Sequence, residues 1–139
     1  MTKEELIQRT QKAAKNHERG YNCAQAVACA FSDLAGMDEA DLFRLTEGLG
    51  LGMGCMEGTC GAISAANILC GLKTSTAHLD RPDSKAASYK LARTCMEAFQ
   101  KKNGSVICKE LKGVETGTVL RSCPGCVEDA VEILATCVF

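Results

Sequence analysis

Apolar side chains recur every three or four residues along most of the chain, which is the spacing of one face of an α-helix. The first stripe runs from Leu6 to His17, inside a helix that we predict from Lys3 to Arg19. The same spacing predicts helices over residues 23–35, 38–48, 60–72, 83–101 and 123–137, and a short turn or helix over 105–111. Strand-forming residues are few and scattered. The expected fold is therefore all-α: one domain over residues 1–139, a bundle of five to six helices.

Polar residues at the predicted helix starts support these boundaries. We expect N-caps from Thr2, Asn22, Asp38, Thr59 and Cys123. The first two are each followed three residues later by Glu or Gln, which completes a capping box. Proline follows Cys123, and proline suits the first position inside a helix.

A glycine occupies every second position from Gly48 to Gly54, directly before Cys55. Each glycine would cost a helix about 1 kcal/mol relative to alanine, so a stable helix is not expected here. We predict a tight loop in which the backbone approaches another part of the molecule, or a cofactor, closely.

Cysteine is the residue type that changes this picture, because the chain has ten cysteines, two histidines and no tryptophan. The N-terminal segment is charged and lacks the apolar stretch of a signal peptide, so we expect a cytoplasmic protein with reduced thiols. A net charge of −1 gives no reason to expect nucleic acid as a partner, and no segment is apolar enough for a membrane. Metal or dithiol chemistry explains such a cysteine content better than structural disulfides do.

Several cysteines stand where the backbone favours anions. Cys23, Cys60 and Cys123 lie at predicted helix starts, Cys108 lies in the short turn, and Cys55 ends the glycine loop. A cluster with four thiolate ligands carries net negative charge, which free backbone N–H groups stabilise. We therefore assign chemistry to Cys23, Cys60, Cys108 and Cys123, and leave Cys55 and Cys126 open. The remaining cysteines lie inside helices on apolar faces and are expected to pack as small hydrophobes: Cys29, Cys70, Cys95 and Cys137.

Other interpretations use the same residues. Cys123 and Cys126 form a C-x-x-C at a helix start, the layout of dithiol oxidoreductases, although the strand–helix alternation of a thioredoxin fold is missing. A zinc site with four cysteines usually needs two C-x-x-C pairs, and the chain has one. The histidines, His17 and His78, are expected to pack or to lie in a loop rather than to bind a ligand.

The cysteine contexts resemble those of the C_GCAxxG_C_C family, whose members are described as redox-active. The matching segments are Tyr21–Val27 around Cys23, Cys60–Ala65 after the glycine loop, Cys108–Gly113, and Cys123 ahead of an apolar helix. The resemblance covers nearly the whole chain, with one departure: Ala65 stands where the motif has glycine. The family also resembles the non-haem portion of split-Soret-type cytochromes, which are associated with an iron–sulfur centre. The resemblance thus implies that Cys23, Cys60, Cys108 and Cys123 are iron–sulfur ligands.

The main hypothesis is therefore an electron-transfer protein with a cysteine-ligated iron–sulfur cluster, [2Fe–2S] in preference to [4Fe–4S]. A thiol–disulfide oxidoreductase using Cys123 and Cys126, without a cofactor, is the first alternative. The second is a binding module stabilised by zinc or by its cysteines. The expected partner is another redox protein. The sequence leaves open whether the protein is an enzyme and whether it forms a homodimer.

Overall fold

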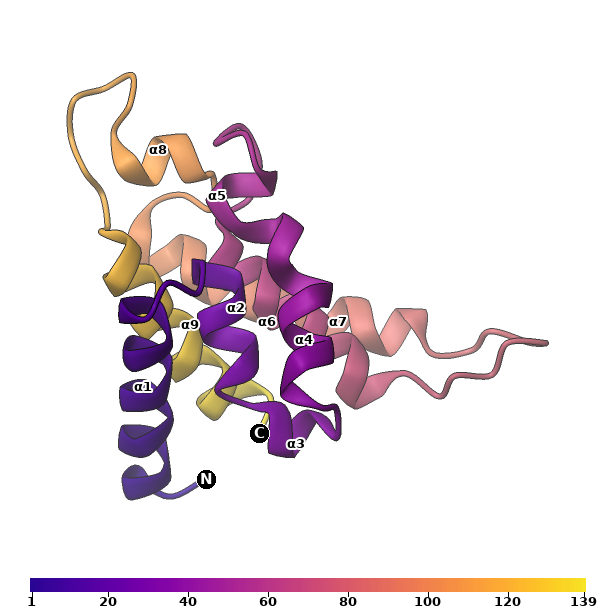
Figure 1. Cartoon of the computed structure of the whole chain (residues 1–139). Coiled ribbons are helices and arrows are strands. Elements are labelled where there is room, and N and C mark those ends of the chain that lie inside the picture. Colours follow the sequence, from indigo (N-terminus) through magenta and orange to yellow (C-terminus); the bar gives the residue numbers. More distant parts are fainter.

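The computed structural model describes residues 1–139 and is all-α, as predicted (Figure 1). Six helices have seven residues or more, in agreement with the expected bundle; the remaining ones are short. The elements are α1 (Lys3–Glu18), α2 (Cys23–Cys29), α3 (Ser32–Ala35), α4 (Glu39–Thr46), η1 (Glu47–Leu49), α5 (Gly50–Met53), α6 (Gly61–Thr74), α7 (Lys85–Asn103), α8 (Cys108–Lys112) and α9 (Cys123–Cys137). None of the helices combines the length and the apolar character that crossing a membrane requires.

The core is built around α2 and α6, the two helices richest in small residues. Every residue of α2 is buried, and so is the first turn and a half of α6, from Gly61 to Ala66. Small side chains let these two helices pack closely against each other, and α1, α4, α7 and α9 surround them. The largest fully buried side chains are those of Phe31 and Phe99.

The continuous helix that we predicted over 23–35 is wrong, because the chain breaks at Phe31. Phe31 has φ −122° and ψ 17°, outside the helical region, and its ring is fully buried. The break frees the carbonyl of Ala30, which accepts a hydrogen bond from the Arg9 guanidinium at 2.9 Å. The same guanidinium forms two bonds of 2.8 Å with Asp33. Tertiary contacts thus compensate a helix break that local propensity does not predict.

Two capping boxes are confirmed, a third N-cap stands at its predicted position without a capping bond, and two N-caps are wrong. Thr2 and Asn22 each cap the N–H of the residue three positions on and receive the reciprocal bond. Asp38 occupies the N-cap position of α4 but makes no capping bond. Cys60 replaces Thr59 as the N-cap of α6, because the Cys60 N–H bonds to the Val106 carbonyl and Thr59 pairs with residue 107. Ser122 replaces Cys123 as the N-cap of α9.

The glycine run is a tight, partly left-handed turn, as its composition predicts. Leu51 has φ 56° and Gly52 has φ 57°, so the short element α5 is not a regular right-handed helix. Gly54 continues the turn with φ 76°. Figure 1 shows α5 and α8 together at the end of the bundle where α1 ends and where α2 and α9 begin. This end of the bundle holds the candidate site.

Candidate thiol-rich redox site

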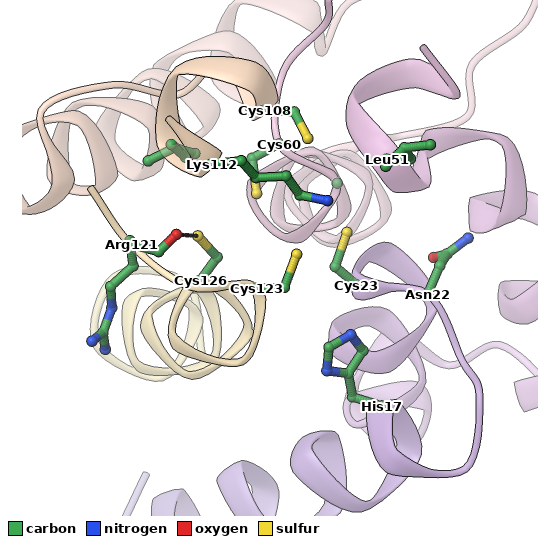
Figure 2. Close-up of a pocket in the computed structure, with 12 residues that line it drawn as sticks. His17, Asn22, Cys23, Leu51, Cys60, Cys108, Lys112, Arg121, Cys123 and Cys126 are labelled. Atoms are coloured by element: carbon green, nitrogen blue, oxygen red, sulfur yellow. Dashed lines mark hydrogen bonds between the residues drawn. The ribbon is translucent and has the colours of Figure 1, made fainter. Parts of the chain in front are cut away.

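Five cysteine thiols line one cavity of about 170 Å³ (Figure 2). They come from four helices far apart in the sequence, and they are Cys23, Cys60, Cys108, Cys123 and Cys126. The structure therefore brings together all four residues to which the sequence analysis assigned chemistry. Cys126, which that analysis left open, is the fifth. Cys55 is exposed and does not line the cavity.

Each of the four predicted residues stands at the start of a helix. Cys23, Cys108 and Cys123 are the first residues of α2, α8 and α9, and Cys60 is the N-cap of α6. Because the Ser122 hydroxyl accepts the capping bond from the Gly125 N–H, at 3.1 Å, the Cys123 thiol is left free to face the cavity. Free N–H groups and helix dipoles at these positions favour negatively charged sulfur.

Backbone pairing draws the segments before α6 and α8 together. The Cys60 N–H donates to the Val106 carbonyl at 2.7 Å, and the Cys108 N–H donates to the Gly58 carbonyl at 3.0 Å. These two bonds cross between the same pair of segments and flank the bridge between residues 59 and 107. They hold Cys60 and Cys108 on neighbouring backbone segments, although 48 positions separate the two residues in the sequence.

Two glycines let the backbone approach the thiols. A Cβ on Gly61 would lie 2.6 Å from the Cys23 sulfur and 2.9 Å from the Leu49 carbonyl oxygen. A Cβ on Gly52 would overlap the Cβ of Cys108 and lie 3.3 Å from its sulfur. Gly52 also needs its positive φ. The glycine loop and the Cys-Gly-Ala segment thus have a direct steric role beside the cysteines.

The thiols influence one another strongly. Contact with the Cys60 thiol, together with burial, raises the pKa of Cys23. The neighbouring Cys126 thiol and burial raise the pKa of Cys60 to about 12. Burial raises the pKa of Cys108, against the opposing charge of Lys112. In the metal-free protein these three thiols therefore stay protonated at neutral pH, whereas a bound metal would displace their protons.

Cys126 differs from the other four in its orientation. Its sulfur faces the Arg121 carbonyl at 4.0 Å, whereas Figure 2 shows the sulfurs of Cys23, Cys60, Cys108 and Cys123 directed toward a common space. The four thiols that share this direction belong to the cysteines at the positions that match the family pattern. The fifth lies beside Cys60 at the edge of the cavity.

The sequence analysis did not place two basic residues, His17 and Lys112, at the cavity. His17 lines it from the end of α1, and Lys112 extends its ammonium toward the thiols from the end of α8 (Figure 2). His17 belongs to the inward-facing stripe of the first helix, and that stripe could have indicated its position. No pattern indicated Lys112. His78 lies far from the site in an exposed loop, where its Nδ1 is 3.0 Å from Asp83.

The thiols around the cavity are the side chains that could hold a cofactor. No three His, Cys, Asp or Glu side chains are grouped so that they could hold one metal ion. The four cysteine ligands of an iron–sulfur cluster are divided among its iron atoms, two per iron in [2Fe–2S] and one per iron in [4Fe–4S], so they do not all converge on one point. Such a group would need the four thiols, the space that the two glycines leave beside them and the positive charge of Lys112.

The comparison with known proteins agrees with the cysteine pattern. Residues 21–137 match the family model described as "Putative redox-active protein (C_GCAxxG_C_C)". No curated protein and no solved structure matches the chain. The matched segment spans all ten cysteines and the glycine loop. The chain therefore belongs to the C_GCAxxG_C_C family of redox-active proteins.

Proposed function

We propose that the protein transfers electrons through an iron–sulfur cluster held by Cys23, Cys60, Cys108 and Cys123. The observation that supports this most is the convergence of these four thiols on one cavity, each from the start of a helix. A bound cluster would supply one-electron chemistry. With four thiolate ligands it would have no open position, which favours relay to another redox protein over catalysis at the metal.

The surrounding residues would tune such a centre through charge and hydrogen bonding. A thiolate-ligated cluster is anionic, and N–H groups at helix starts together with the Lys112 ammonium would stabilise that charge. Burial acts in the opposite sense, because a buried centre loses the stabilisation that water gives to its more highly charged form. Cys23, Cys60 and Cys108 are all buried. The potential would therefore depend on the balance of these two effects.

The test is an anaerobic purification followed by visible absorption and by iron and acid-labile sulfide assays. Protein that is brown as purified, or after reconstitution with iron and sulfide, would support the proposal. The iron content per chain would distinguish [2Fe–2S] from [4Fe–4S]. Colourless, iron-free protein that also resists reconstitution would contradict it.

Serine variants locate the ligands. Each single replacement of a proposed ligand should remove most of the bound iron; the ligands are Cys23, Cys60, Cys108 and Cys123. Cys126→Ser is the matched control, because Cys126 lines the same cavity but faces the Arg121 carbonyl. Cys126→Ser should retain its iron, and loss of iron from this variant alone would mean that the ligand set is wrong.

A second candidate function is thiol–disulfide exchange, and the position of Cys123 and Cys126 on the same cavity, in the first turn of α9, favours it. Cys123 is only half-buried, so it is the thiol of the site most open to a substrate. On this view Cys123 would attack a disulfide and Cys126 would resolve the intermediate. Metal-free protein that reduces a small disulfide, and loses this activity in Cys123→Ser and Cys126→Ser, would support the exchange reaction over the cluster.

A further inference from the structure

A second group of cysteines lies away from the cavity, where α6, α7 and α9 pack together. The Cys70 and Cys95 sulfurs are 3.7 Å apart, and both side chains are fully buried. Cys137, at the end of α9, is half-buried. The sequence analysis assigned all three residues to packing, because it could not show that their helices place them together.

The contact between two sulfurs distinguishes this pair from an ordinary buried cysteine. Cys29 is also fully buried, but the polar neighbour of its thiol is the Glu39 carbonyl at 3.7 Å rather than another thiol. For Cys70 and Cys95, the polar neighbour of each thiol is the other thiol. Their sulfurs would need to approach from 3.7 Å to roughly 2 Å to form a disulfide.

Cys137 connects this pair to the surface. Its side chain lines a surface pocket of about 190 Å³ between α7 and α9, together with Ala98 and Lys102. Cys137 ends α9, which packs against both α6 and α7, the helices that carry the pair. Burial raises the pKa of Cys137, and the neighbouring Cys95 raises it further. A reagent that cannot reach the buried pair directly can react first at Cys137, because that thiol is partly exposed.

We propose that Cys70 and Cys95 form a second redox site, which a small disulfide such as oxidised glutathione converts to a disulfide by way of Cys137. The Cys137 thiolate attacks one sulfur of the small disulfide, and the first small thiol leaves. The thiolate of one member of the pair then attacks the Cys137 sulfur and expels the second small thiol. Finally the other member attacks the sulfur of the first, which forms the Cys70–Cys95 bond and returns Cys137 to a free thiol.

Over the whole exchange, Cys70 and Cys95 together lose two electrons and two protons, and the small disulfide gains these electrons and protons as it becomes two thiols. The resulting bond joins α6 to α7, and α6 also carries Cys60 at its start. The reaction uses none of the thiols in the cavity. Its outcome therefore does not depend on whether that cavity holds iron.

The test is thiol mapping of the whole protein after treatment with oxidised glutathione. Remaining thiols are alkylated under denaturing conditions, and the peptides are identified by mass. We expect Cys70 and Cys95 to escape alkylation and to appear in one linked peptide pair that lacks two hydrogen atoms, while Cys29, the matched buried control, is alkylated. Complete alkylation of Cys70 and Cys95 after prolonged treatment would overturn the proposal.

Two variants test the entry route. Cys137→Ser should slow formation of the bond by about tenfold or more, because exchange rates depend on access to a reactive thiol. The double variant Cys70→Ser/Cys95→Ser should accumulate glutathione on Cys137, since both residues that could resolve this intermediate are gone. An unchanged rate in the first variant, or no adduct in the second, would overturn the role of Cys137. The mapping of the unmodified protein tests the pair itself even if a variant fails to fold.

Discussion

Gly61→Ala tests the steric relation between the start of α6 and the candidate site. The added Cβ would lie 2.6 Å from the Cys23 sulfur, 2.9 Å from the Leu49 oxygen and 3.1 Å from the Gly50 Cα. Ordinary contacts between carbon atoms are about 3.5–4.0 Å, so these neighbours must move by roughly 0.5–1 Å. Two of the three atoms belong to the backbone of the glycine loop, which cannot relieve the contact by side-chain rotation.

The expected cost is that of overpacking a buried site, about 1–3 kcal/mol of the free energy of unfolding. Alanine also recovers up to about 1 kcal/mol of helix propensity relative to glycine. Gly71→Ala is the matched control, because Gly71 lies in the same helix and an added Cβ there meets nothing within 4 Å. We therefore expect Gly61→Ala to be about 1–3 kcal/mol less stable than Gly71→Ala, the difference being the overpacking cost alone.

Urea denaturation of both variants and of the unmodified protein, followed by circular dichroism, measures this difference. The iron content after anaerobic reconstitution provides a second measurement, because displacement of the Cys23 sulfur should lower it in Gly61→Ala but not in Gly71→Ala. If Gly61→Ala is as stable as Gly71→Ala and retains the same iron, the close approach at Gly61 has no role in the site, and the steric reasoning is refuted.

Three further predictions concern polar contacts that stabilise the bundle. Asp129 is fully buried and forms ion pairs with Arg121 and Lys102. Burial raises the pKa of Asp129, but the two cations outweigh the effect of burial and hold this pKa below its ordinary value of 3.8. Its contribution to stability is therefore complete above about pH 4 and is lost as the pH falls through the lower folded-state pKa, so Asp129→Asn should flatten the acid limb of a stability–pH curve. At pH 7 the same substitution should cost about 1–3 kcal/mol in urea denaturation, because it removes charge-assisted bonds to two cations that remain partly solvated; an unchanged stability would contradict this. Ser122→Ala should cost about 1 kcal/mol through loss of the N-cap of α9, and Thr118→Ala, in the exposed loop, is its control. Arg9→Lys should lower the thermal midpoint, because lysine cannot reproduce the paired bonds to Asp33 while also bonding the Ala30 carbonyl; an unchanged midpoint would show that the helix break at Phe31 does not depend on them.

Local sequence was sufficient for most of the helices because their signals act within one or two turns. The capping boxes at Thr2 and Asn22 join residues three positions apart, and both are present in the structure. The glycine run likewise indicated a turn, since alternating glycines remove helix propensity wherever they stand. The same local criteria failed at Phe31, where a buried ring and the bonds from Arg9 stabilise a break.

The sequence by itself determined the all-α class and the position of Cys23, Cys60 and Cys123 at helix starts, because helix propensity and composition are local properties. Only the tertiary structure decided which thiols share a cavity, because that depends on long-range packing. It placed Cys126 beside Cys60, excluded Cys55 from the cavity, and paired two helix-interior cysteines that the sequence showed only as separate apolar positions.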